Sequence, residues 1–163
     1  MLTALEQGVR GGKWFRLIDK VFSELCLFAA ARQVLANRGA AGVDHVLVDD
    51  FNARLSTELR KLPESLRDGT YRPQVIRRVE IPKPGSKELR PLGIPTVHDR
   101  VVQAALVKVL EPTFEAEFAE HSYGFRPGRS CRDALRRVDG LIKAGYTHVV
   151  DADVKTLLRF DSA

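Results

Sequence analysis

A chain of 163 residues, 44% apolar and 29% charged, has the length and composition of one soluble folded domain. No apolar run is long enough to span a membrane, and Glu6, Arg10 and Lys13 interrupt any signal-peptide pattern, so we expect a cytoplasmic protein without a membrane partner. The net charge of +5 permits a polyanionic partner, while the two distant cysteines, Cys26 and Cys131, suggest no disulfide framework and are expected to be free thiols.

The first part of the sequence predicts helices. Residues 1–12, which end in two glycines, are expected to form a mobile lead-in. One helix is then expected to end near Gly39. Its apolar residues, predicted to lie in the core or at an interface, recur at helical spacing: Trp14, Phe15, Ile18, Val21, Phe22, Leu25 and Phe28. A second helix is expected to begin at a cap on Asp49 or Asp50, to break or restart at Pro63, and to end at Gly69.

The middle of the sequence predicts a β-hairpin. From Val75 to Ile81 the side chains alternate with the period of a strand. The residues around Gly85 predict a turn, and residues 89–94 can return as the second strand. Pro91 favours an edge position for that strand because proline cannot donate a ladder hydrogen bond.

Two capping boxes predict two further helices. Thr96 and Asp99 have the spacing of one box, and Ser130 and Asp133 have the spacing of the other. Gly145 is expected to end the second of these helices.

Residues 146–154 predict a buried strand that carries two acids. Alternation places Asp151 and Asp153 on the same face of that strand. Carboxylate oxygens suit Mg²⁺, and phosphoryl transfer commonly uses two such ions. Acids at this spacing are also common at strand ends, where they simply reach solvent, so both interpretations stay open.

Two basic segments are candidates for binding phosphate. The hairpin carries Lys83, Lys87 and Arg90, and the later loop carries Arg126 and Arg129. Arginine offers a bidentate fork to phosphate and lysine a point charge. The alternatives are a solvated hairpin face and an arginine-bearing connector. The histidines are scattered and are interpreted as structural or surface residues.

The order of several motifs resembles that of group II intron reverse transcriptase/maturases over residues 13–155. The motifs are Gly42-Val43-Asp44, the segment Tyr71-Arg72-Pro73, the hairpin IPKPGSKELRPLGIPT, the segment Asp99-Arg100-Val101-Val102, the loop SYGFRPGRS and the segment VVDADVK. The resemblance implies an α+β fold with helical fingers, a β-hairpin and the first strand of a right-hand polymerase palm, truncated. It implies a helical extension of the fingers over 13–69, followed by fingers and the first palm strand over 70–163.

The resemblance also implies roles for particular residues. Asp153 matches the first catalytic, Mg²⁺-binding aspartate, and Asp151 is a weaker metal candidate. Lys83 and Arg90 match cations that contact the nucleotide triphosphate. The cations expected to contact nucleic acid are Arg72, Arg77, Arg78, Lys87, Arg126 and Arg129. The implied partners are group II intron RNA, an RNA template with a DNA primer, and deoxynucleotides.

After Lys155 the sequence departs from the family pattern Gly-Phe-Phe-Asp-Asn, and Tyr-x-Asp-Asp does not occur. The departure suggests a frameshift, a premature stop or a disrupted gene. We therefore expect a fragment of an RNA-directed DNA polymerase acting in intron mobility and splicing, inactive alone. The alternatives are a non-catalytic basic RNA-binding remnant or module, and a chain that does not fold stably because its last strand lacks neighbours.

Overall fold

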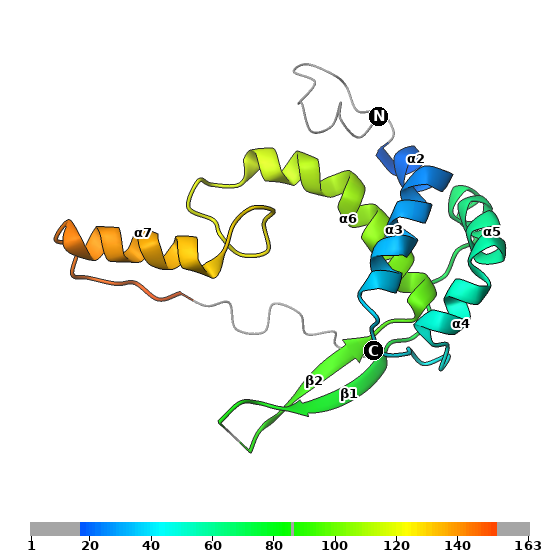
Figure 1. Ribbon diagram of the computed structural model, residues 1–163, viewed down its shortest axis with the longest axis horizontal. Helices are drawn as coiled ribbons and strands as arrows, with labels where there is room; N and C mark the ends of the chain where they lie inside the picture. Colours follow the sequence, from blue (N-terminus) through cyan, green and yellow to red (C-terminus); the bar gives the residue numbers. More distant parts are fainter. Residues whose placement is uncertain (1–16, 86, 153–163) are drawn as a thin grey trace. The chain divides into compact units, whose positions relative to one another are not determined.

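The computed structural model describes residues 17–85 and 87–152, and the predicted lead-in over 1–12 lies outside them. The chain forms two compact units, one ending at Glu117 and the other beginning at Phe118. The first unit contains α2 (Leu17–Val21), α3 (Glu24–Ala36), α4 (Val48–Ala53), α5 (Leu55–Arg67), β1 (Arg77–Pro82), β2 (Leu89–Ile94) and α6 (Val97–Glu117), and the second contains α7 (Cys131–Lys143) (Figure 1). The predicted α+β composition is confirmed, whereas the division at residues 69 and 70 stays a prediction.

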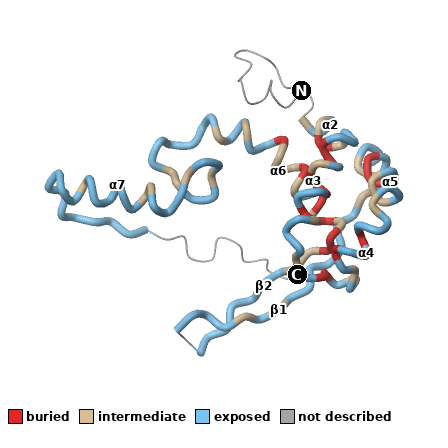
Figure 2. The backbone as a smooth tube through the Cα atoms, viewed as in Figure 1, coloured by how far each residue is buried: buried red, intermediate tan, exposed pale blue. Residues whose placement is uncertain are grey.

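The core of the first unit lies between its helices. α3 lies along α6, and α2, α4 and α5 pack around this pair. Small side chains such as Ala30 and Ala105 let the two long helices approach, and the Cys26 thiol donates to the Ala105 carbonyl at 3.7 Å. Burial raises the pKa of this thiol. Figure 2 shows the buried residues concentrated on these helices, whereas the hairpin and α7 are largely exposed.

The prediction of one helix up to Gly39 is wrong, because the described part of that segment forms α2 and α3. Ser23 separates them, and its hydroxyl accepts a hydrogen bond from the Cys26 N–H as the N-cap of α3. The buried face of α3 also differs from the predicted stripe. Leu27, Ala30 and Ala31 are buried, whereas Leu25 and Phe28 are exposed. Trp14 and Phe15 lie outside the described residues.

The predicted cap at Asp49 or Asp50 is also wrong, since α4 begins at Val48. Asp50 instead lies in the first turn, where its carboxylate accepts a hydrogen bond from the Leu47 N–H. Pro63 does not break the next helix: α5 continues to Arg67, with Leu62 and Pro63 buried against the core. Packing of the apolar stripe outweighs the local cost of the proline.

The hairpin forms as predicted and is clamped at its base by one carboxylate. β1 and β2 are antiparallel, with Arg77 opposite Ile94 and Pro82 opposite Leu89. Asp99 is only 4% exposed. Its carboxylate accepts hydrogen bonds from the Tyr71 hydroxyl, from the Gln74 N–H at 3.1 Å and from the Thr96 hydroxyl at 2.7 Å. One side chain therefore holds the segment that enters the hairpin and the residue that follows it.

A glycine-rich loop, residues 39–42, is fixed against the same base. The Arg77 guanidinium donates to the Ala41 carbonyl at 3.2 Å, and the Arg100 guanidinium donates to the Ala40 carbonyl at 2.7 Å. A Cβ atom at Gly42 would lie 2.6 Å from the Thr96 Cα, so the two backbones touch at this point. Burial lowers the pKa of Arg100, whose Nε is buried without a hydrogen-bond partner in the described structure.

The second unit contains α7 and an exposed segment. The Ser130–Asp133 capping box is confirmed, and the hydrogen bond from Ser130 lowers the pKa of Asp133. Gly145 follows the helix with φ 95°, as a terminating glycine does. The predicted strand is wrong over residues 146–152, which form no strand and are exposed. A strand needs a neighbour for its backbone hydrogen bonds, and no described segment pairs with this one.

Replacing Tyr71 with phenylalanine tests the clamp. Tyr71→Phe removes one hydrogen bond to a buried carboxylate and should lower the free energy of unfolding by about 1–2 kcal/mol in urea denaturation. Tyr146→Phe, an exposed control, should change nothing. Burial, with the hydrogen bond and charge of Asp99, raises the pKa of Tyr71 above its ordinary value of about 10. Because the pKa is raised in the folded state, the Tyr71 hydroxyl makes its full contribution to the free energy of unfolding below pH ~10. That contribution is lost as the pH rises further.

The stability difference between these two proteins is therefore expected to change in one direction when the experiment is repeated above pH ~10. The stability difference between wild type and Tyr71→Phe should shrink as the pH rises. A difference that stays constant or grows would contradict the assignment of the clamp.

Replacing Gly42 tests the contact between the loop and the hairpin base. Gly42→Ala would place a methyl group against the Thr96 backbone, which cannot move aside as a flexible side chain would. We expect the free energy of unfolding, measured by thermal or urea denaturation, to fall by at least about 2 kcal/mol. Gly140→Ala in α7 is the control, because its added Cβ meets nothing within 4 Å and alanine favours helix. Equal effects of the two substitutions would show that the contact is not tight.

Candidate nucleic-acid interface

The hairpin brings Lys83 and Arg90 onto one face. Ile81 pairs with Arg90, and the Lys83 N–H donates to the Glu88 carbonyl at 2.9 Å, so the ladder continues one step past the strands. Because side chains alternate along a strand, Ile81, Lys83 and Arg90 share a face. The two cations predicted to contact a triphosphate therefore lie close together on one side of the ribbon.

Lys83 already has a carboxylate partner. Its Nζ lies 2.7 Å from the Glu88 carboxylate, and this contact lowers the pKa of Glu88. Both side chains are exposed, so the ion pair contributes little to stability and an incoming phosphate could displace Glu88. Within residues 17–85 and 87–152, the side chains of Lys87 and Arg90 have neither a hydrogen bond nor an ion pair.

The cations at the hairpin base are engaged within the chain. Arg77 holds the Ala41 carbonyl, as described above, and Arg72 donates to the carbonyls of Gly69 and Tyr71 at 2.7 and 2.9 Å. Arg78 lies 3.6 Å from the Glu80 carboxylate in an exposed pair. Arg72 and Arg77 thus order the backbone around the hairpin, whatever else they contact.

The two arginines of the second unit hold their own loop together. Arg126 donates to the carbonyls of Ala119 and Ser122, each at 2.9 Å, and its guanidinium lies 5.2 Å from the Phe118 ring centroid. Arg129 donates to the Glu120 carbonyl at 2.8 Å. Arg126 and Arg129, predicted as nucleic-acid contacts, therefore also determine the shape of the loop that carries them.

The predicted metal site cannot be located in the described structure. Asp153 lies outside the described residues, and Asp151 is exposed in the segment that forms no strand. Among residues 17–85 and 87–152, no group of three potential metal-ligating side chains comes together. The role of Asp153 stays a prediction from sequence, as do the other residue roles.

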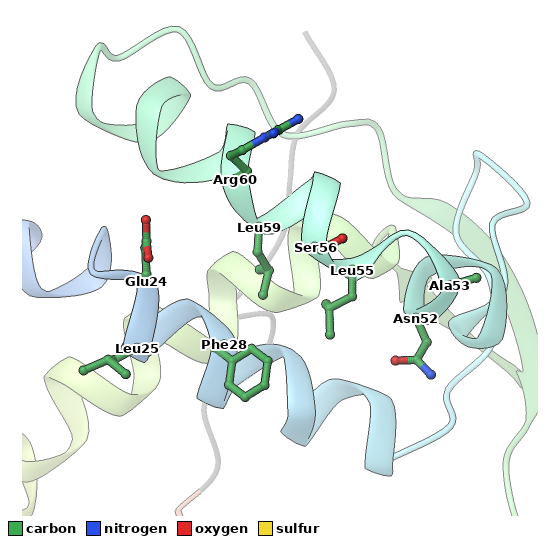
Figure 3. A pocket seen from close by; sticks show the side chains of 9 residues that line it. All are labelled: Glu24, Leu25, Phe28, Asn52, Ala53, Leu55, Ser56, Leu59 and Arg60. Carbon is green, nitrogen blue, oxygen red and sulfur yellow. The ribbon is translucent and has the colours of Figure 1, made fainter.

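An apolar groove of about 760 Å³ lies between α3 and the α4–α5 segment. Figure 3 shows Phe28 of α3 and Leu55 and Leu59 of α5 among the side chains that line it. It contains none of the predicted site residues. None of the described helices is both long and apolar enough to cross a membrane.

Sequence reasoning missed the roles of two acids: Asp99, which holds the base of the hairpin, and Glu88, which pairs with Lys83. Asp99 was recognised as part of a capping box, but its bonds to Tyr71 and Gln74 span 28 and 25 residues and leave no local pattern. Glu88 could have been found, since an acid five residues after Lys83 lies opposite it across a short turn.

Comparisons with known proteins show what this chain is similar to. A family model described as "Reverse transcriptase (RNA-dependent DNA polymerase)" matches residues 81–158. Group II intron-encoded protein LtrA of Lactococcus lactis subsp. cremoris is 37% identical over 146 residues, covering 85% of this chain and 24% of that protein. Protein YkfC of Escherichia coli K12 is 46% identical over 125 residues, covering 76% of this chain and 32% of that protein.

A plant protein extends the same relationship. Nuclear intron maturase 1, mitochondrial, of Arabidopsis thaliana is 42% identical over 64 residues, which are 39% of this chain and 9% of that protein. The chain thus spans about a quarter to a third of LtrA and YkfC, the first curated relatives it matches. The ordered motifs, the reverse transcriptase match and these similarities together identify the chain as a relative of group II intron-encoded proteins and intron maturases.

Proposed function

We propose that this chain is the fingers part, with the opening of the palm, of a group II intron reverse transcriptase/maturase that binds intron RNA in intron mobility and splicing. The observation that carries the proposal is the clamped hairpin with Lys83 and Arg90 on one face. Fixing both ends of the ribbon at Asp99 orients its exposed cations before any ligand arrives. Such an arrangement suits a phosphate-rich ligand because little ordering remains to be done on binding.

In the proposed interface the hairpin cations have different roles. Lys83 and Arg90 would contact the triphosphate of an incoming deoxynucleotide, and Glu88 would release Lys83 when the phosphate takes its place. Lys87 at the turn, with Arg72, Arg77 and Arg78 at the base, would lie along RNA template or intron RNA. Arg126 and Arg129 would bring the loop of the second unit to nucleic acid.

Magnesium has a limited part in this proposal. Mg²⁺ would supply charge stabilisation for phosphoryl transfer, with Asp153 as its ligand and Asp151 as a weaker candidate. Magnesium takes near-octahedral oxygen coordination, and the described residues provide no cluster of three ligands.

The second candidate is a basic RNA-binding module without catalytic activity. It is favoured by the exposed, strand-free segment before Asp153, because a catalytic carboxylate needs rigid support. Both candidates require RNA binding, and only the first requires that the chain belong to a polymerase site. Two measurements on the 163-residue polypeptide separate them.

RNA binding should depend on salt and on Lys87. Fluorescence anisotropy with a structured RNA should show affinity that falls as salt rises, because phosphate contacts release counterions. Lys87→Gln should weaken binding roughly three- to sixfold near physiological salt and reduce the slope of log K against log salt by about one. Lys61→Gln on α5 removes the same charge from another exposed site and should have no such effect. Absence of binding by the wild-type chain at low salt would refute both candidate functions.

Primer extension tests catalysis directly. The 163-residue polypeptide, given an RNA template, a DNA primer, deoxynucleotides and Mg²⁺, should synthesise no cDNA, because one matched carboxylate is too few for a two-metal site. A full-length relative serves as the positive control. Magnesium-dependent cDNA made by the chain, and lost in Asp153→Asn, would contradict this expectation and establish the chain as a polymerase in its own right.

A further inference from the structure

Phe125 is the most exposed large apolar residue in the described structure. Its relative exposure is 110%, so the ring contacts nothing that shields it from water. The neighbouring aromatic side chains are engaged: Phe118 lies under the Arg126 guanidinium, and Tyr123 lies under Arg129 and stacks beside His121. Phe125 therefore has no packing role in the loop to explain its size or its apolar character.

The backbone of Phe125 is strained. Its φ angle is 56°, in the left-handed region that glycine and asparagine adopt far more easily than a bulky residue. Such strain persists only where the surroundings enforce it, and it often marks a site of function. A glycine here would remove the strain without losing any contact that the described structure contains.

The loop holds this strained conformation firmly. The three hydrogen bonds from Arg126 and Arg129 to the carbonyls of residues 119, 120 and 122 close the loop on both sides of Phe125. A Cβ atom added at the preceding Gly124 would meet nothing within 4 Å, so packing inside the chain does not require glycine there. The space beside the ring is open, and a ligand can approach the backbone closely.

The charges near this loop favour nucleic acid over an apolar protein surface. Residues 118–152 carry more cationic than acidic side chains. Arg132 and Arg137 on α7 have no ion pair among the described residues, whereas Arg136 and Lys143 are paired with Asp133 and Asp139. An exposed aromatic ring and unpaired cations in the same unit suit single-stranded nucleic acid, where a ring stacks on a base and cations follow the phosphates.

We infer that Phe125 is a stacking residue for an unpaired base of RNA, presented by a loop that Arg126 and Arg129 hold in a strained conformation. The inference rests on the proposed function, since it specifies how the RNA partner is contacted. The role of Phe125 is separate from charge, because its ring would stack on the face of a base and would not contact the phosphate backbone.

The test compares RNA with and without bases. An oligoadenylate of roughly ten nucleotides containing 2-aminopurine, and an abasic oligonucleotide of the same length, are titrated by anisotropy. Phe125→Ala should bind the oligoadenylate about tenfold more weakly, with an unchanged salt slope, and Phe125→Tyr should bind it like the wild type. The wild type and Phe125→Ala should bind the abasic strand equally. Quenching of 2-aminopurine should occur with Phe and Tyr and not with Ala.

Two further variants control for structure. Phe125→Gly should unfold at the same or a higher temperature than the wild type, because it relieves the positive φ, while losing the base-dependent affinity. Leu135→Ala removes another exposed apolar side chain of the same unit and should not change RNA binding. Opposite effects on stability and binding at one position would not arise from a merely structural residue.

The outcomes distinguish the inference from the function on which it rests. If the wild type binds neither oligonucleotide at low salt, RNA binding itself is refuted, and the stacking role with it. If the wild type binds in a salt-dependent way but Phe125→Ala binds oligoadenylate equally well, only the stacking role is overturned. Self-association of the wild type that is lost in Phe125→Ala, with RNA binding unchanged, would likewise overturn it in favour of a protein contact.

Discussion

The Asp99 carboxylate holds together the part of the first unit on which the proposed hairpin contacts depend. It is buried at the start of α6 and accepts hydrogen bonds from the hydroxyls of Tyr71 and Thr96 and from the backbone N–H of Gln74. A buried carboxylate is costly unless it is hydrogen-bonded, so these donors are required once the acid is buried. The same requirement fixes both ends of the hairpin, and a two-stranded ribbon would otherwise be only marginally stable in water.

Several arginines of this chain donate hydrogen bonds to backbone carbonyls and so stabilise its loops. Arg77 and Arg100 hold the loop at residues 39–42 against the hairpin base, and Arg126 and Arg129 hold the loop around Phe125. A guanidinium has several donors in a fixed plane, so it can bind a carbonyl and still present an edge to phosphate. A count of basic residues therefore overstates the charge available to a partner. In the hairpin, Lys87 and Arg90 are the predicted contacts without an internal partner in the described residues.

The two units differ in how their apolar residues are used. In the first unit α3 and α6 bury small and branched side chains against each other, and the core is continuous through α4 and α5. In the second unit α7 buries no residue, and its apolar side chains Leu135, Val138 and Ile142 are exposed. An amphipathic helix takes most of its stability from packing, so α7 depends on its capping box and its i,i+4 ion pair between Asp139 and Lys143.

The sequence by itself determined the local features. The hairpin, the end of α5 at Asp68 and Gly69, the Thr96 hydroxyl that accepts the Asp99 N–H, and the capping box at Ser130 follow from turn chemistry and side-chain spacing within a few residues. The family resemblance was also readable from ordered motifs. Only the tertiary structure decided that Pro63 stays within a helix, that Phe28 lies outside the core, and that residues 146–152 form no strand. It also decided that Asp99 clamps the hairpin and that Phe125 is held outward, because burial, strand pairing and long-range hydrogen bonds depend on partners distant in sequence.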